Sequence, residues 1–177
     1  MACMMNRLSF CIRRLGQAQF QLDALRELFR DYNQYLGINL DFQNFEEELA
    51  QLPGRYAVER RGQLFLVEAL ETSQTEPVFV GCAGLYGRTE HQCEVKRVYV
   101  DPAYQGHGLG RQLMEAAIAD ARAYGYQELV LDSLRRLESA RILYEKLGFQ
   151  EIKPYNENPH DDVYYMALDL TVSGREG

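Results

Sequence analysis

Apolar residues in the first third of the chain recur three or four positions apart, which is the spacing of one face of an α-helix. The first set predicts a helix that stops at Gly37 and contains Leu25, Leu28, Phe29, Tyr32, Tyr35 and Leu36. A shorter helix, capped by Asp41 and ended by Pro53-Gly54, is predicted from an apolar face of Phe42, Phe45, Leu49 and Leu52. The run at residues 8–15 ahead of both helices indicates a strand.

The pattern changes to that of β-strands between residues 62 and 100. Runs rich in β-branched and aromatic residues occupy positions 62–70, 77–87 and 93–100, and the last of them alternates less cleanly than the others. Polar turns at 71–76 and 88–92 connect them. We therefore expect an antiparallel meander in the first half of the chain.

The second half alternates between helix and strand. A helix is predicted from near Leu109 to Gly125, with an apolar stripe of Leu113, Met114, Ala117, Ile118 and Ala121. The nearly continuous apolar run ELVLDSL is typical of a buried parallel strand. A further helix, stopped by Gly148, carries Ala140, Leu143, Tyr144 and Leu147, and the runs FQEIKPY and DVYYMAL follow as strands. The predicted fold class is α+β, an antiparallel sheet followed by a strand–helix–strand–helix crossover.

Composition and charge narrow the functional classes. The 177 residues, 46% of them hydrophobic, contain no linker or repeat, so we expect a single domain over residues 1–177. A net charge of -7 without a Lys/Arg tract argues against binding to nucleic acid or to an anionic membrane. The chain has neither a signal-peptide pattern nor a run approaching the roughly 20 apolar residues of a membrane span. We therefore expect a cytoplasmic protein whose 4 cysteines are free thiols.

Three glycines, Gly106, Gly108 and Gly110, lie within QGHGLGRQL at the start of a predicted helix. Their spacing is not that of a dinucleotide-binding fingerprint, because Arg111 stands where its third glycine would fall, and the Gly-Lys-Ser/Thr of a Walker loop is absent. Two explanations remain. One is a tight turn that needs positive φ angles. The other is a phosphate cradle, formed by backbone N–H groups of residues 105–111 and the positive end of the helix.

Two segments resemble the GNAT superfamily of acetyl-CoA-dependent N-acetyltransferases. VDPAYQGHGLGRQL contains the family signature Gln/Arg-x-x-Gly-x-Gly/Ala at Gln105, Gly108 and Gly110, and ARILYEKLGF, about thirty residues later, is similar to a second segment typical of the family. The order of predicted elements fits the family from Leu8 to Leu170. The resemblance implies the GNAT fold, a mixed and largely antiparallel sheet of about seven strands with helices on both faces.

The resemblance also implies where acetyl-CoA, the cosubstrate, would bind. Its diphosphate would lie on the glycine loop, against Gln105, Gly106, His107, Gly108, Leu109, Gly110 and Arg111. Its pantetheine arm would lie between the strand at 93–100 and the ELVLDSL strand, hydrogen-bonded to the backbone around Val98, Tyr99 and Val100. Family members often bind this arm with an asparagine where this chain has Leu137, and Ser139 is the candidate substitute.

Acetyl transfer to an amine needs a base for the amine, an acid for the leaving thiolate and a donor for the oxyanion. By family position, Tyr144 is the candidate acid, Glu94 the candidate base and the Val98 N–H the oxyanion donor. The alternatives are a core position for Tyr144, a solvent-exposed strand position for Glu94, and a water chain as the base. Because no His, Cys or Asp cluster has metal-ligand spacing, no metal is expected.

The resemblance implies direct acetyl transfer, in a ternary complex, to a primary amine of a small molecule or peptide. The acceptor region would comprise 33–45 and 153–162, where the candidates to meet an amine are Tyr35, Phe42, Phe45, Tyr155, Asn156, Glu157, Asp161 and Asp162. The alternative, favoured for any single one of them, is a hydrophobic helix face in the first segment and a polar hairpin turn in the second. The alternatives are a GNAT-fold module that binds acyl-CoA without turnover and a nucleotide-binding oxidoreductase. Many family members dimerise, and this sequence has no coiled coil or interface stripe that decides whether it forms a homodimer.

Overall fold

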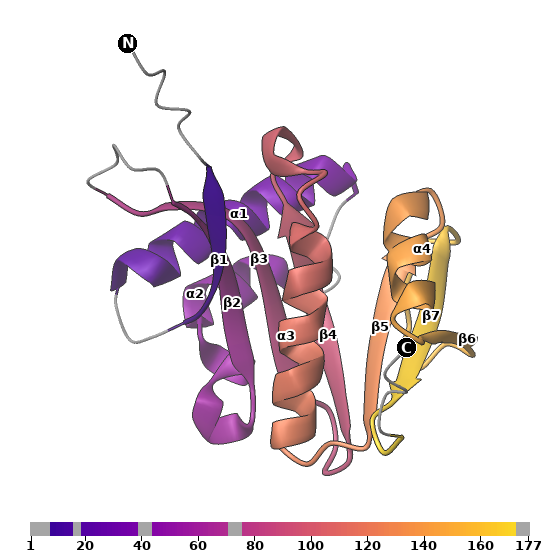
Figure 1. Ribbon diagram of the computed structural model, residues 1–177. Helices are drawn as coiled ribbons and strands as arrows, with labels where there is room; N and C mark the ends of the chain where they lie inside the picture. Colours follow the sequence, from indigo (N-terminus) through magenta and orange to yellow (C-terminus); the bar gives the residue numbers. More distant parts are fainter. Residues whose placement is uncertain (1–7, 16–18, 39–43, 71–75, 173–177) are drawn as a thin grey trace.

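The computed structural model describes residues 8–15, 19–38, 44–70 and 76–172. The described strands form a seven-stranded sheet with the order β1-β2-β3-β4-β5-β7-β6. The sheet is twisted (Figure 1). The strands are β1 (Ser9–Arg14), β2 (Gln63–Leu70), β3 (Val78–Gly87), β4 (Gln92–Val100), β5 (Glu128–Leu134), β6 (Gln150–Ile152) and β7 (Val163–Asp169). The helices are α1 (Gln19–Leu36), α2 (Phe45–Gln51), α3 (Leu109–Ala123) and α4 (Glu138–Lys146), with short 3₁₀ turns at η2 (Gly54–Tyr56), η3 (Val58–Arg60) and η4 (Pro102–Tyr104).

The pairing of the strands confirms the predicted meander and the mixed, largely antiparallel sheet. β1 to β4 pair antiparallel in chain order, and β7 pairs antiparallel with both β5 and β6. β4 and β5 form the parallel pair. The prediction of a buried parallel strand for ELVLDSL therefore holds on one side of β5, and the other side is antiparallel to β7.

Helices cover both faces of the sheet, as predicted. α1 and α2 lie on one face, and α3 and α4 lie on the other (Figure 1). Successive side chains of β2 point to opposite faces of the sheet. Leu64 and Leu66 pack in the core beneath α1 and α2, and Phe65 and Val67 pack in the core beneath α3. The period-2 pattern of the strands thus determines which face each side chain covers.

Glycines in the left-handed region follow three helices at the predicted positions. Gly37 (φ +61°) follows α1, Gly125 (φ +81°) follows α3 and Gly148 (φ +95°) follows α4. The predicted cap Asp41 and the apolar residue Phe42 lie outside the described residues. Of the helices that the structure describes, none combines the length and the apolar character needed to cross a membrane.

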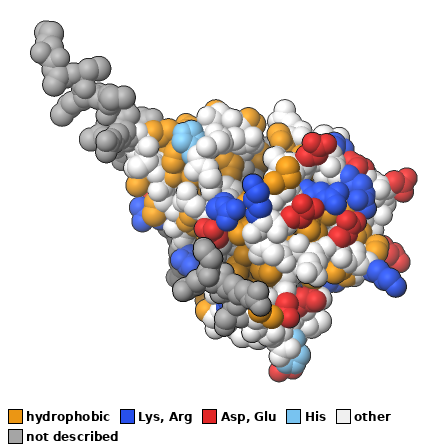
Figure 2. Space-filling view, turned by 45° about the vertical axis from the view of Figure 1, so that its right-hand side comes forward, with side chains coloured by type: hydrophobic (Ala, Val, Ile, Leu, Met, Phe, Trp, Pro, Cys, Tyr) orange, Lys and Arg blue, Asp and Glu red, His pale blue; other side chains and the backbone are white. Residues whose placement is uncertain are grey.

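The face of the molecule that includes α4 and β6 carries intermixed charges. Figure 2 shows basic and acidic side chains next to one another there. Arg141 pairs with Glu145 (3.0 Å) along α4, and Arg135 pairs with Glu151 (3.1 Å) of β6. Such exposed pairs contribute little to stability. They leave the described part of this face without a continuous basic surface.

Candidate active site

β4 and β5 separate along most of their length. Their parallel pairing is confined to residues 92–94 of β4 and 128–130 of β5, whereas β5 pairs with β7 from end to end. The N–H of Asp101 donates to the Val80 carbonyl of β3 (2.9 Å). Since backbone groups alternate in direction along a strand, those of Val98 and Val100 point away from β3, toward β5. Beyond Glu94, the described strands leave this side of β4 unpaired.

A β-bulge accompanies this separation. Cys82 faces Tyr99 and Gly84 faces Lys96, so Arg97 and the residue after it share one partner on β3. Arg97 has φ +58°, which a non-glycine residue rarely adopts. A bulge bends a strand and increases its twist, which carries the end of β4 away from β5. The imperfect alternation seen in this strand is the sequence signal of the bulge.

Arg97 is held in this conformation by a buried ion pair with α2. Its side chain is 3% exposed, and it donates from Nε (3.1 Å) and Nη2 (3.0 Å) to the two carboxylate oxygens of Glu48. Arg55 and the hydroxyl of Tyr56 also donate to Glu48, each at 2.7 Å. Burial alone would raise the pKa of Glu48, but Arg97, Arg55 and Tyr56 hold it below its ordinary value. The ion pair thereby connects α2 to the bulge of β4.

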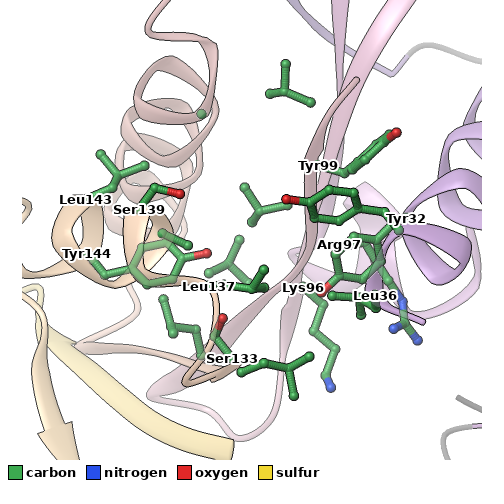
Figure 3. Close-up of a pocket in the computed structure, with 18 of the residues that line it drawn as sticks. Tyr32, Leu36, Lys96, Arg97, Tyr99, Ser133, Leu137, Ser139, Leu143 and Tyr144 are labelled. Atoms are coloured by element: carbon green, nitrogen blue, oxygen red, sulfur yellow. The ribbon is translucent and has the colours of Figure 1, made fainter. Parts of the chain in front are cut away.

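A cavity of about 520 Å³ occupies the space between the separated strands. It is lined by residues 95–100 of β4, residues 131–134 of β5, the glycine loop with the start of α3, one face of α4 and the end of α1. Figure 3 shows Ser139 and Tyr144 on the α4 side, opposite Tyr99 and Tyr32. The two sequence segments that carry the family resemblance therefore meet at one cavity.

The glycine loop forms one end of the cavity. Gly106 (φ +83°) and Gly108 (φ +72°) have the positive φ angles that the turn explanation requires, and a side chain added at either would meet open space. α3 begins at Leu109, and its first internal hydrogen bond runs from the Gln112 N–H to the Gly108 carbonyl (3.1 Å). The first-turn amides of α3 therefore lack partners within the helix, which favours an anion at this end.

The structure places most, but not all, of the predicted cosubstrate-binding residues at the cavity. Those that line it are Val98, Tyr99, Val100, Gln105, Gly106, Gly108, Leu109, Gly110, Arg111 and Ser139. Gln105 also donates from its side chain to the Val100 carbonyl (3.0 Å), which ties the loop to the end of β4. His107 is not a lining residue, because its ring packs on Phe10 (5.1 Å between centroids).

Tyr144 projects from α4 into the cavity. Its side chain packs in the core beneath α3 and also lines the cavity. A position in the core is therefore compatible with a position at the site. Its hydroxyl is directed across the cavity toward β4 (Figure 3). Burial, together with the nearby Tyr32, Tyr164 and Asp132, raises the pKa of Tyr144 well above its ordinary value. The phenol keeps its proton at neutral pH and can act as a donor.

Glu94 lies beside the cavity without lining it. It is 1% exposed, so the alternative of a solvent-exposed strand carboxylate is wrong. Tyr86 donates to one carboxylate oxygen, and Tyr155 donates to the other (3.1 Å). Arg88 and Lys96 each approach the carboxylate to 3.4 Å. Both oxygens are thus engaged by neighbouring donors.

Two charged residues that sequence analysis did not select line the cavity next to Glu94. Lys96 of β4 places Nζ 3.5 Å from Oδ1 of Asp132 on β5, and it contacts Glu94 on its other side. The sequence signal for Asp132 is a carboxylate that directly follows the apolar residues 129–131 of ELVLDSL. In the residues that the structure describes, no group of three His, Cys, Asp or Glu could hold a metal ion.

An aromatic wall faces α4 across the cavity. Tyr99 of β4 packs against Tyr32 and Tyr35 of α1, with ring centroids 6.1 and 5.9 Å apart. Burial raises the pKa of Tyr32 and of Tyr99 to about 12, so both stay protonated at neutral pH. Tyr32, predicted only as part of the apolar face of the first helix, also lines the cavity. Phe45, a candidate for the acceptor region, is 3% exposed in the core on the α1 and α2 side of the sheet, so the alternative of a hydrophobic helix face holds for it.

The 153–162 segment contributes to the site in a different way from that expected. Asn158 lines the cavity, whereas Tyr155 donates to Glu94 and Asp162 pairs with Arg136 (3.7 Å). The other candidates there, Asn156, Glu157 and Asp161, are not lining residues. This segment therefore contacts Glu94 through Tyr155 and lines the cavity through Asn158.

Comparisons with known proteins agree with the geometry. Residues 22–149 match the family model described as the acetyltransferase (GNAT) family. An uncharacterised N-acetyltransferase of Schizosaccharomyces pombe is 33% identical over 151 residues, covering 85% of this chain and 89% of that protein. One from Dictyostelium discoideum is 27% identical over 218 residues, covering 89% and 98%.

A solved structure shares the fold. The spermidine N-acetyltransferase of Vibrio cholerae, in complex with CoA and spermine, aligns with a TM-score of 0.65 at 19% identity, over 92% of this chain and 96% of that one. That likeness concerns the fold alone, whereas the family model and the yeast relative concern the sequence itself. The chain therefore belongs to the GNAT family of acetyltransferases and is an acyltransferase enzyme.

Proposed function

We propose that this protein, as a single domain, transfers the acetyl group of acetyl-CoA directly to a primary amine in a ternary complex. The observation that carries the proposal is the unpaired side of β4, which faces β5 across the cavity and ends at the glycine-capped start of α3. An extended arm with amide groups can pair with such a strand edge, and a diphosphate can bind at such a helix end.

The residues at the glycine end fit a coenzyme diphosphate. Gly106 and Gly108 leave open space in front of the first-turn amides of α3. Gly110 has room only for ordinary contact, since an added Cβ would lie 3.6 Å from Leu143. Arg111 and Lys146 line the same cavity and supply positive charge. Acetyl-CoA bound there would supply an activated acetyl group as a thioester.

The remaining groups supply the proton transfers. Tyr144 holds a proton inside the cavity and is the proposed donor to the leaving thiolate. The Val98 N–H, on the unpaired side of β4, is the proposed donor to the oxyanion. The carboxylates of Glu94 and Asp132, linked by Lys96, are the groups from which a base is available.

The acceptor is proposed to be an amine that is a cation in solution. Tyr32, Tyr35 and Tyr99 form an aromatic wall on one side of the cavity, and Asp132 and Asn158 add oxygen acceptors. Aromatic faces and carboxylates both favour an ammonium group. A small molecule and the amine of a peptide share this chemistry.

Alanine at Gly108 is expected to weaken acetyl-CoA binding at least tenfold, because the new methyl group would extend into the open space proposed for the diphosphate and the strained φ would shift the neighbouring amides. Gly125 offers a matched control at the other end of α3, with φ +81° and open space around it. Both substitutions should cost about 1 kcal/mol of stability. Calorimetric titration with acetyl-CoA should show weaker binding by the Gly108 variant than by the Gly125 variant. Equal affinities would contradict binding of the diphosphate at Gly108.

The function itself is tested by release of free CoA thiol from acetyl-CoA in the presence of an amine panel. The panel should include polyamines, amino acids and peptides with a free N-terminus or a lysine side chain. We expect amine-dependent thiol release, with the acetylated amine identified by mass spectrometry. Binding of acetyl-CoA without amine-dependent release would instead indicate the acyl-CoA-binding module.

A further inference from the structure

We propose that Asp132 is the catalytic residue that takes the proton from the acceptor amine, and that Glu94 is a positioning residue that acts through Lys96. The inference rests on the proposed function and assigns the base for the same reaction. It differs from the sequence-based prediction, in which Glu94 itself is the base.

Asp132 occupies the point at which the two strands come apart. The last parallel pair joins Glu94 to Val130, so Asp132, two residues further along β5, lies just inside the opening. It lines the cavity from β5, as Val95 and Lys96 do from β4. A carboxylate there stands next to the strand edge on which the acetyl group is proposed to lie.

The Asp132 carboxylate lacks part of its expected hydrogen bonding. Its side chain is 11% exposed, and Oδ1 has a long contact of 3.5 Å with Lys96. Oδ2 is buried and has no hydrogen-bond partner in the described residues. Buried carboxylate oxygens are ordinarily satisfied by donors. An ammonium group that enters the cavity and competes with the long Lys96 contact would supply a donor to this carboxylate.

Glu94 is placed differently. Tyr86 and Tyr155 donate to its two oxygens, and Arg88 and Lys96 approach at 3.4 Å. It does not line the cavity. An amine would have to displace one of these donors to reach it. The contact that Glu94 does make toward the cavity is with Lys96, which in turn contacts Asp132.

The groups around Asp132 come from five segments. They are Glu94 and Lys96 of β4, Tyr32 of α1, Tyr144 of α4, Tyr155 of the 153–162 segment and Tyr165 of β7. Burial first, and the Asp132 charge in addition, raises the pKa of each of these four tyrosines. Asp132 and Tyr144 thus face one cavity as a proton acceptor and a proton donor, a division typical of acid–base pairs.

Asp132 takes one proton from the ammonium group, and the freed nitrogen lone pair forms the bond to the thioester carbonyl carbon. The carbon–sulfur bond then breaks, and the sulfur takes the proton of Tyr144. The second nitrogen proton restores the Tyr144 phenol, and Asp132 releases its proton to solvent.

The test compares Asp132→Asn with Glu94→Gln, using acetyl-CoA and the best amine of the panel from about pH 6 to about pH 9. We expect Asp132→Asn to lower kcat/KM about 100-fold without changing acetyl-CoA affinity. Its log kcat/KM should rise one unit per pH unit, because only the free amine then reacts, whereas the wild type should rise less steeply. Glu94→Gln should keep the wild-type pH profile with a smaller loss.

Two further variants keep the result interpretable. Asp132→Glu retains a carboxylate and should restore the shallow profile, which loss of folding would not do. Asp169→Asn, an exposed aspartate at the end of β7, is the matched control and should behave as wild type. The wild type could be active while Glu94→Gln shows the steep pH profile and Asp132→Asn keeps the shallow one. That result would overturn the assignment of Asp132 as the base and leave the proposed function standing. A wild type that releases no CoA with any amine would overturn the proposed function and the inference together.

Discussion

Replacing Tyr144 with phenylalanine is expected to lower kcat about 100-fold or more while leaving the Kd for acetyl-CoA unchanged. The substitution removes one hydroxyl from a ring that is otherwise packed in the core. Its neighbour Phe149 lies 6.0 Å away between ring centroids, a contact that phenylalanine retains. Folding should therefore persist while the proton donor is lost.

The effect is expected to be large because Tyr144 is the proposed proton donor to the leaving sulfur. The thiolate of CoA has a basicity close to that of cysteine, about pKa 8.5, so its departure benefits from a proton. Tyr144 carries a proton at neutral pH because burial raises its pKa, and its hydroxyl is directed into the cavity (Figure 3).

Tyr126→Phe is the matched control for this prediction. Tyr126 is 4% exposed, and its hydroxyl donates to the Arg61 carbonyl (3.2 Å), away from the cavity. It should lose some stability and no turnover. Stopped-flow or steady-state thiol release gives kcat, and calorimetry gives Kd. Unaltered turnover in Tyr144→Phe would show that Tyr144 is a core residue only.

Glu48→Gln is expected to lower the free energy of unfolding by about 3 kcal/mol, because it leaves the buried guanidinium of Arg97 without its counterion. Arg97 is 3% exposed and Glu48 is 7% exposed at their side chains, so solvent cannot replace the lost charge. Since the pair also fastens the bulge of β4 to α2, acetyl-CoA affinity should fall as well.

The same pair gives stability a pH dependence with a definite sign. The folded-state pKa of Glu48 lies below its ordinary value of 4.5. The stabilisation is therefore complete above that value and is lost as the pH falls through the folded-state pKa. The difference between wild type and Glu48→Gln should be full at neutral pH and should shrink in acid.

Urea unfolding at several pH values measures this difference, with Glu46→Gln, an exposed carboxylate of the same helix, as the control. The control should unfold like the wild type. If Glu48→Gln and Glu46→Gln behave alike at neutral pH, the ion pair does not hold the bulge, and the account of why β4 leaves β5 is wrong.

Sequence periodicity was enough to predict the sheet and helices, because period 2 in β2 and a three-to-four spacing in α1 and α3 each identify a buried face. The glycines that end α1, α3 and α4 were predictable for a similar reason, since positive φ angles favour glycine. The glycine loop and LYEKLGF were recognisable from their resemblance to known segments, although local patterns could not show that they meet at one cavity.

Contacts between segments far apart in the chain were not predictable. The uneven alternation at 93–100 indicated an irregular strand, but not that Arg97 would pair with Glu48 of α2, 49 residues earlier. Lys96 and Asp132 become neighbours only because β4 and β5 adjoin. His107 lies in the glycine loop, where its sequence position suggested contact with the diphosphate. Its ring instead packs on Phe10 of β1 and does not line the cavity.

A crystal structure with CoA bound would show where the coenzyme lies relative to the separated strands. We expect the pantetheine arm between β4 and β5, hydrogen-bonded to the backbone of Val98 and Val100, and the diphosphate at the first-turn amides of α3. A coenzyme bound outside this cavity, with the edge of β4 still unpaired, would contradict this expectation.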